Sequence, residues 1–185
     1  MNRRQRRRRA MMVRIVALAP LVAGVVSWGI GLALGPVHQE RTSKSYSSSP
    51  EAVWAALVDL DGMPGWRRDL AKVERLPVEN GAARWLEIGV RGRRSVLERV
   101  ESVPQHRMTV VAARGDHLGF RWTYQLAPDG NGTRLEVVEE RTVRNPAIRA
   151  IVRMLGSDRG LIEGVTRDLE ARLAGHRQGI AAALP

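Results

Sequence analysis

Apolar residues dominate one stretch near the start of the chain. No charged residue occurs between Ile15 and Val37, a run of 23 residues. A helix of that length rises about 34 Å, enough to cross a hydrocarbon core of about 30 Å with some tilt. The pattern therefore predicts a transmembrane helix over residues 15–37.

After this stretch, apolar positions alternate with polar ones, which predicts strands. In residues 118–126 every even position is apolar and every odd position is polar or glycine, as expected for a half-buried strand. Leu86, Ile88 and Val90 alternate in the same way with polar residues or glycine. Further strands are expected around residues 41–47, 96–103, 108–112 and 133–143.

Turn residues separate these strands and indicate how they connect. Gly92 and Pro104 each close a predicted strand, and residues 129–132 read Asp-Gly-Asn-Gly, which is typical of a hairpin turn. Because short turns join consecutive strands, we expect an antiparallel meander.

Two segments carry helical signals instead. Ser49-Pro50-Glu51 supplies a cap, a proline for the first turn and an acid near the positive end of the helix dipole; residues 59–66, rich in Gly and Pro, end this helix. Asn145-Pro146 begins a second helical region, which Gly156-Ser157-Asp158 interrupts. Its apolar stripes are Ile148, Ile151, Val152 and Leu155, then Leu161, Val165, Leu169 and Leu173 at spacing four. We expect a long, broken helix at the end of an α+β domain.

Positive charge is concentrated before the apolar stretch. Seven arginines and no acidic residue lie in the first 14 positions. Because arginines stay on the cytoplasmic side, we expect a single-pass cell-membrane protein with a cytoplasmic N-terminus and an extracytoplasmic C-terminal domain. A cleaved secretory signal is the alternative. However, the apolar cores of signal peptides run about 7–15 residues, and the small residues around 32–35 that could form a cleavage site are followed by Pro36, which disfavours cleavage. A basic run also attracts nucleic acid, but its position against an apolar span favours a role in topology, and no nucleic-acid partner is expected.

The remaining charge suits one ordinary folded domain. Of the formal net charge of +11, seven belong to the N-terminal arginines, so residues 38–185 carry 23 Lys and Arg against 19 Asp and Glu, a net of +4. The chain has no cysteine, which excludes disulfides, thiolate catalysis and zinc held by cysteines. The expected organisation is a basic cytoplasmic N-terminus (1–14), a transmembrane helix (15–37), a linker (38–44), a domain (45–175) and a C-terminal tail (176–185).

The order of the elements resembles a known superfamily. It consists of a strand, a helix with a Pro-Trp corner, antiparallel strands and a long terminal helix. The residues that carry the resemblance are Ser49-Pro50-Glu51-Ala52-Val53-Trp54, Asp59 through Met63-Pro64-Gly65-Trp66, Trp122-Thr123-Tyr124-Gln125-Leu126-Ala127-Pro128, Gly132-Thr133-Arg134-Leu135 and Asn145-Pro146. On these residues the chain resembles the SRPBCC superfamily, which includes START-like and polyketide cyclase/dehydrase and lipid-transport proteins. The resemblance implies the helix-grip fold, in which a curved antiparallel sheet wraps around the C-terminal helix.

The same resemblance implies an elongated, mostly apolar cavity between the sheet and that helix. Its expected occupant is a hydrophobic small molecule or a lipid. The residues expected to line it are Trp66, Phe120, Trp122, Tyr124, Leu161, Val165 and Leu169. Whether these residues only pack the core or also contact a ligand stays open. A buried Tyr hydroxyl or Trp N–H needs a partner, so either could orient the polar end of a ligand.

Two further pairs each allow two interpretations. Gly160 and Gly164 lie one turn apart on the terminal helix, where glycine costs up to about 1 kcal/mol relative to alanine. Tight packing on the sheet explains them, and so does room for a ligand. Glu139 and Arg141 share strand parity with Leu135 and Val137. They would either point inward and bind a polar head group or lie exposed at the strand end, and exposure is the expectation.

The sequence offers little catalytic chemistry. None of the four histidines has a metal-ligand partner at a suitable spacing. His117 precedes the strand at 118–126 and could act as a general acid or base, but a surface turn histidine is the expectation. We therefore assign no catalytic residue, metal or cofactor.

Three functions remain. The leading hypothesis is a membrane-anchored, extracytoplasmic domain that binds a hydrophobic or lipid-like molecule. The alternative is a cyclase/dehydratase-type enzyme on the same fold. Two buried ionisable groups within reach of one point in the cavity would favour this alternative. The third is an interaction module without a cavity.

Overall fold

A computed structural model describes residues 23–114, 118–155 and 159–183, with the backbone alone described at residues 113–114, 153–155, 159–161 and 176–183. A helix over residues 23–33 comes first. The elements that follow are β1 (Val37–Tyr46), α2 (Pro50–Val58), η1 (Met63–Gly65), β2 (Leu70–Glu79), β3 (Ala82–Gly89), β4 (Arg94–Val103), β5 (Arg107–Arg114), β6 (Leu118–Asp129), β7 (Gly132–Val143), α3 (Pro146–Leu155) and α4 (Arg159–Ala183).

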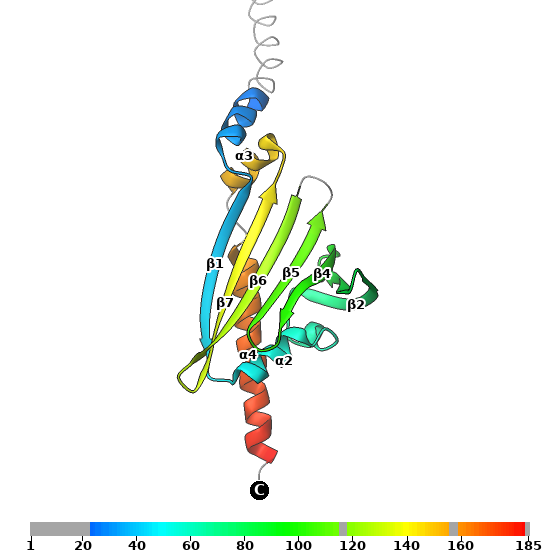
Figure 1. The fold of residues 1–185 in the computed structure, drawn as a ribbon, viewed down its shortest axis with the longest axis vertical. Coiled ribbons are helices and arrows are strands. Elements are labelled where there is room, and N and C mark those ends of the chain that lie inside the picture. The colour runs from blue at the N-terminus through cyan, green and yellow to red at the C-terminus, as the bar shows by residue number, and fades with distance from the viewer. Residues whose placement is uncertain (1–22, 115–117, 156–158, 184–185) are drawn as a thin grey trace, which may run out of the picture. The chain divides into compact units, whose positions relative to one another are not determined.

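The strands form one antiparallel sheet in the order β1-β7-β6-β5-β4-β3-β2. The predicted hairpin is confirmed, because β6 ends at Asp129 and β7 begins at Gly132. Gly130 has a φ of 59° in this turn, a conformation that glycine adopts without steric cost. Figure 1 shows α4 running behind the strands. The structure thus confirms the α+β class and the helix-grip arrangement.

The two edge strands differ from the prediction. β1 begins at Val37 and pairs along its length with β7, from Val37 opposite Thr142 to Tyr46 opposite Thr133. Residues 38–44, expected as a linker, are therefore part of the sheet. β2 was not predicted, because Pro77 and several charges interrupt its alternation. Both features are tolerated in an edge strand, where one side of the backbone has no partner strand.

The core lies between the sheet and the helices α2 and α4. Ser49 caps α2 as predicted, accepting a hydrogen bond from the amide of Ala52 at 3.4 Å. Val53 of α2, Leu135 of β7 and Leu169 of α4 are the largest apolar contributors among the fully buried side chains. Burial of such side chains is the main force that holds a domain of this size together.

The predicted apolar stripe of α4 is confirmed in part. Leu169 and Leu173 are buried in the core, Val165 is half-buried, and the side chain of Leu161 lies outside the described residues. The other buried side chains of the described part of α4 are Ile162, Thr166 and Asp168, because positions four apart rotate by about 40° at each step around a helix. The helix also continues to Ala183, so most of the segment expected as a tail after residue 175 is helical.

The chain divides into two compact units, which we describe separately. The larger comprises residues 37–142 and α4, and the smaller comprises the described residues 23–36 and 143–155. Of the predicted transmembrane segment, residues 15–22 lie outside the described residues. Within the part of the chain that the structure describes, no helix has both the length and the apolar character that crossing a membrane requires.

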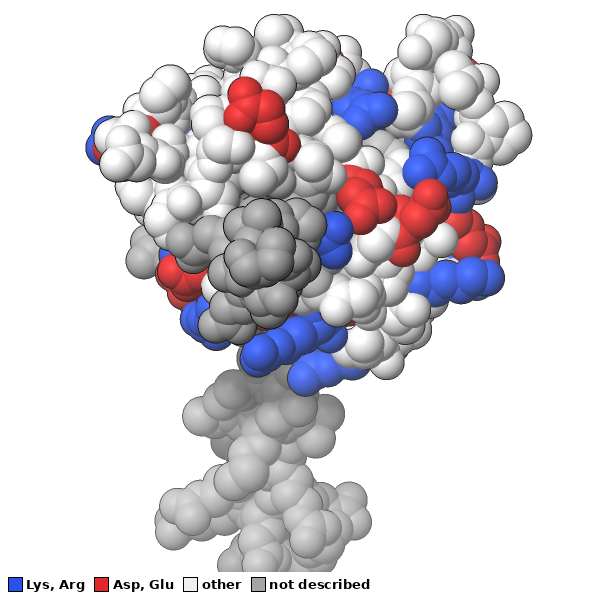
Figure 2. All heavy atoms as spheres, turned by 90° about the horizontal axis from the view of Figure 1, so that it is seen from below, with Lys and Arg blue, Asp and Glu red and all other residues white. Residues whose placement is uncertain are grey.

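The surface of the larger unit carries both signs of charge. Exposed ion pairs join Arg75 to Asp61 at 2.8 Å and Arg134 to Asp129 at 3.2 Å. Figure 2 shows basic and acidic side chains next to one another on the face seen from below. Mixed charge of this kind is typical of a solvated protein surface.

Candidate functional site

A cavity of about 120 Å³ lies between the sheet and α4. Strands β3 to β7, the segment from α2 to residue 67, and α4 all contribute to its wall. Six of the seven predicted residues are on that wall: Trp66, Phe120, Trp122, Tyr124, Val165 and Leu169. The side chain of Leu161 lies outside the described residues. The structure therefore brings the aromatic side chains of β6 and the middle of α4 together around one space.

One side of the cavity is an aromatic and aliphatic wall. The rings of Phe120 and Trp122 stack with centroids 5.6 Å apart and an interplanar angle of 5°. On the neighbouring strand, Ala112 lies opposite Phe120 and Val110 opposite Trp122, and both are buried on the cavity wall. Such a surface favours contact with the apolar part of a ligand.

A buried ion pair lies beside this wall. Arg141 Nη2 donates to Glu139 Oε1 at 2.9 Å, and Trp122 Nε1 donates to Glu139 Oε2 at 3.1 Å. The Arg141 guanidinium lies 5.4 Å from the centroid of Phe120. Glu139 is only 4% exposed, so the expectation of an exposed strand end was wrong. Strand parity points the pair inward, and Trp122 and Arg141 supply the hydrogen bonds that a buried carboxylate needs.

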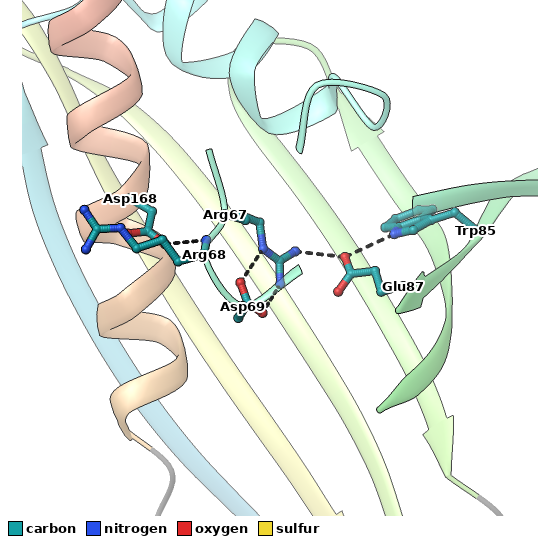
Figure 3. A network of polar contacts seen from close by, with 6 residues as sticks. All are labelled: Arg67, Arg68, Asp69, Trp85, Glu87 and Asp168. Carbon is teal, nitrogen blue, oxygen red and sulfur yellow. Dashed lines mark hydrogen bonds and ion pairs between the residues drawn. The ribbon is translucent and has the colours of Figure 1, made fainter. Parts of the chain in front are cut away.

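A second charged cluster comes from the loop after η1 and from β3 (Figure 3). Arg67 donates to Asp69 Oδ2 and to Glu87 Oε1, both at 2.8 Å. Trp85 Nε1 donates to the same oxygen of Glu87 at 3.3 Å. Burial alone would lower the pKa of Arg67, but Glu87 and Asp69 outweigh burial and raise it. Arg67 therefore carries a permanent positive charge beside the cavity.

The same loop is fastened to α4. The backbone amide of Arg68 donates to Asp168 Oδ2 at 2.9 Å, and Asp168 is buried on α4. This bond holds the loop that carries Trp66 and Arg67 against the terminal helix, as Figure 3 shows for Arg67, Arg68 and Asp168. A loop placed by the scaffold can hold a binding side chain at a fixed position.

Tyr124 lines the same cavity as the two charged clusters. Burial raises its pKa to about 12; Arg67 opposes this in part, while Glu87 and Glu139 raise it further. A tyrosine hydroxyl is protonated at neutral pH even at its ordinary pKa of about 10, so it can donate a hydrogen bond to a ligand.

Two buried donors on the cavity wall have no hydrogen-bond partner in the described structure. They are Trp66 Nε1 and Arg141 Nε. A buried donor without a partner costs about 1–3 kcal/mol, and a ligand oxygen that accepted its hydrogen bond would recover part of that cost. Both side chains are on the cavity wall, so a small shift of either toward the cavity would let it donate to an oxygen of a ligand whose body rests on the aromatic wall.

Of the charged residues at the site, Glu139 and Arg141 were considered as an inward-pointing pair, whereas the cluster of Arg67, Asp69 and Glu87 was missed. On β3, Trp85 and Glu87 line the cavity, whereas Leu86, one of the apolar positions from which the strand was predicted, is not on the cavity wall. The parity of Glu87 with Trp85 was the available signal. A side chain at Gly164 would meet nothing within 4 Å, so close packing does not explain that glycine. His117 and Gly160 lie outside the residues whose side chains are described, and the described residues contain no cluster able to hold a metal.

Comparisons with known proteins agree with this architecture. A family model described as polyketide cyclase/dehydrase and lipid transport matches residues 39–178. The search of curated proteins found no match to this chain.

Several solved structures share the fold. A Thermus thermophilus protein, with 21% identity and a TM-score of 0.63, aligns over 75% of this chain and 99% of its own. Norcoclaurine synthase from Thalictrum flavum, solved with dopamine and hydroxybenzaldehyde, has 13% identity and a TM-score of 0.61 over 80% of this chain and 91% of its own. A START superfamily protein from Mycobacterium smegmatis has 17% identity and a TM-score of 0.55 over 75% and 98%. At these identities the likeness establishes the fold alone.

Proposed function

The chain belongs to the polyketide cyclase/dehydrase and lipid transport family, and we propose that its cavity binds a hydrophobic or lipid-like small molecule between the sheet and α4. The observation that carries the proposal is the cavity itself. Its wall combines the Phe120–Trp122 stack with the unpartnered donors of Trp66 and Arg141. An apolar wall with a few polar groups is the usual form of a small-molecule site.

The size of the cavity limits the part of the ligand that it can enclose. Its volume is about 120 Å³, and an apolar cavity of about 150 Å³ admits a benzene molecule. The enclosed part of the ligand is therefore about one ring or a short alkyl segment. A longer chain would have to extend out of the cavity or open it further. The expected ligand has a compact apolar body and an oxygen that accepts hydrogen bonds.

The proposal includes a membrane anchor with the domain on the extracytoplasmic side. Its support is the uncharged stretch at residues 15–37, the arginines before it, and the described helix over residues 23–33, whose apolar side chains are exposed. Attachment to the bilayer would keep the cavity at high local concentration near lipid. A cleaved signal remains the alternative, and N-terminal sequencing of the mature protein would distinguish the two.

A second candidate function is a cyclase/dehydratase-type enzyme. The observation that favours it is that Tyr124 and two buried carboxylates, Glu87 and Glu139, line one cavity. A hydroxyl or carboxyl group that contacts a substrate can donate or accept a proton. Tyr124→Phe would keep ligand binding and abolish turnover in an enzyme, whereas a binding protein shows no turnover in either form. The interaction module without a cavity is disfavoured because a cavity is present.

Replacement of a small residue on the cavity wall tests the binding proposal. Ala112→Leu fills the cavity beside Phe120, and Val96→Leu enlarges an exposed valine of β4 that is not on the wall. The wild type and both variants are reconstituted as full chains in nanodiscs of defined lipids and extracted with organic solvent, and the three extracts are compared by mass spectrometry. We expect the extracts of the wild type and of Val96→Leu to contain a small molecule that the extract of Ala112→Leu lacks. Equal recovery from all three, or none from any while apolar probes also fail to bind, would refute the proposal.

A further inference from the structure

Helix α3 exposes the apolar stripe that the sequence predicts. Ile148 is 40% exposed and Ile151 is 50% exposed, although Ala150 between them is fully buried. Water is therefore in contact with two large aliphatic side chains on one face of a short helix. In the described part of the smaller unit, no other segment covers this face. An exposed apolar face on a helix indicates a contact with something outside the described residues.

The position of α3 is fixed relative to the helix over residues 23–33. Arg149 Nη1 donates to the carbonyl oxygens of Gly31 at 2.7 Å and Leu34 at 2.5 Å. These carbonyls lie at the C-terminal end of the first helix, where backbone acceptors have no partner within the helix. A guanidinium there also complements the negative end of the helix dipole.

A close backbone approach reinforces this connection. A Cβ on Gly31 would collide with the backbone of Pro146, the first residue of α3. Only glycine allows the two segments to come so near. Two independent features therefore hold the start of α3 at the C-terminal end of the preceding helix.

The exposed side chains of the first helix are apolar, as expected for a helix surrounded by lipid. Val25 and Leu32 are 73% and 64% exposed, and Val26, Trp28 and Ile30 are also exposed. If this helix is the last part of a membrane span, its C-terminal end lies near the lipid headgroups. α3 then lies at the same level, because Arg149 and Gly31 hold it there.

The charge of the segment fits that location. Residues 143–157 contain the arginines Arg144, Arg149 and Arg153 and no acidic residue. A helix with an apolar face and basic side chains binds at an interface that contains anionic lipid, with its apolar face about 5–10 Å into the boundary of headgroups and acyl chains.

We propose that α3 is an interfacial membrane helix, with Ile148 and Ile151 inserted among lipids next to the point where the anchor leaves the bilayer. This inference rests on the proposed anchoring and adds a second lipid contact to it. The occupant of the apolar face is the bilayer surface, because α3 is held at the end of a helix whose own exposed side chains are apolar.

Single cysteines provide the test, because the chain has no cysteine of its own. Ile148→Cys and Ile151→Cys are labelled with an environment-sensitive fluorophore in the full chain, which is reconstituted in nanodiscs containing anionic lipid. Val26→Cys reports on the anchor, and Val96→Cys, on the exposed side of β4, is the matched soluble control. Nitroxide groups on the lipids, placed either near the headgroup or deep in the acyl chain, quench labels at their own depth.

We expect the labels at 148 and 151 to lose fluorescence with the shallow nitroxide, the label at 26 to lose it with the deep one, and the label at 96 to lose it with neither. Quenching at 26 together with soluble behaviour at 148 and 151 would leave the anchor in place and overturn the role of α3. Absence of quenching at all positions would overturn both. Shielding at 148 and 151 that appears only in nanodiscs with two chains would identify a second copy as the occupant, which also contradicts the proposal.

Discussion

The indole Nε1 of Trp122 donates a hydrogen bond to the buried carboxylate of Glu139 at 3.1 Å. The bond links β6 to its neighbour β7 at the cavity wall. Arg141 binds the other carboxylate oxygen at 2.9 Å. The buried carboxylate of Glu139 at the cavity wall is thus neutralised by Arg141 of the same strand and oriented by the indole of Trp122 on β6.

Removal of that indole donor should destabilise the domain. Trp122→Phe deletes the hydrogen bond to Glu139, whereas Trp66→Phe removes an indole nitrogen that has no partner. Both substitutions lose similar apolar area. Hydrogen bonds to charged groups contribute about 1.5–3 kcal/mol, and Trp66→Phe also removes a buried donor that has no partner. We therefore expect the loss for Trp122→Phe to exceed that for Trp66→Phe by at least about 1.5–3 kcal/mol. Urea unfolding measures both free energies; equal losses would show that the bond contributes nothing.

Breaking the second charged cluster should have a larger effect than breaking a surface pair. Arg67 and Glu87 are both nearly buried, and loss of one partner from a buried pair costs about 3–5 kcal/mol. We expect Arg67→Met to lower the free energy of unfolding by roughly that amount. Arg75→Met breaks the exposed pair with Asp61 and should change stability little, since water screens such pairs. Similar unfolding midpoints for the two variants would contradict this prediction.

The contrast between β6 and β3 shows how far the sequence can predict this fold. On β6, apolar side chains line the core or the cavity and the polar ones, including the buried Thr123, lie on the other face, so alternation identified both the strand and its inner face. On β3 the inner face carries Trp85 and Glu87, because the cavity replaces part of the core. Alternation then indicates the wrong face. A strand that places a charged side chain in the cavity cannot be oriented by hydrophobicity alone.

The charged part of the site depends on contacts between distant strands. Parity placed Glu139 on the same face as Leu135, but an isolated carboxylate there would be too costly to bury. Trp122 makes burial possible, and its position opposite Glu139 follows from the pairing of β6 with β7. The edge strand β2 was missed for a similar reason, since Pro77 is tolerated only because one side of that strand has no partner.

The alkaline stability of the protein should depend on its two tyrosines. Burial, and then the charge of Glu170, raise the pKa of Tyr46. Burial, opposed by Arg67 and reinforced by Glu87 and Glu139, raises the pKa of Tyr124 to about 12. A raised folded-state pKa stabilises the protein below the unfolded pKa of about 10. That stability is lost as the pH rises from about 10 through the folded-state values.

We therefore expect the free energy of unfolding to fall by about 2 kcal/mol between pH 10 and 12 through Tyr124, and further through Tyr46. The tyrosinate absorbance of the folded protein should not develop near pH 10. Tyr124→Phe should reduce the pH dependence without removing it. Tyrosinate absorbance that develops near pH 10 while the near-ultraviolet circular dichroism stays native would refute the burial of both hydroxyls.

Two glycines of the first helix should respond differently to the addition of one methyl group. A Cβ on Gly31 would meet the backbone of Pro146, while a Cβ on Gly29 would meet nothing within 4 Å. Overpacking costs about 1–3 kcal/mol, so Gly31→Ala should weaken the contact with α3 and the hydrogen bonds from Arg149. Gly29→Ala should leave that contact intact, because alanine is the better helix former. Amide hydrogen exchange in α3 of the full chain should accelerate by roughly tenfold to a hundredfold for Gly31→Ala only; equal protection in both variants would show that the close approach does not fix α3.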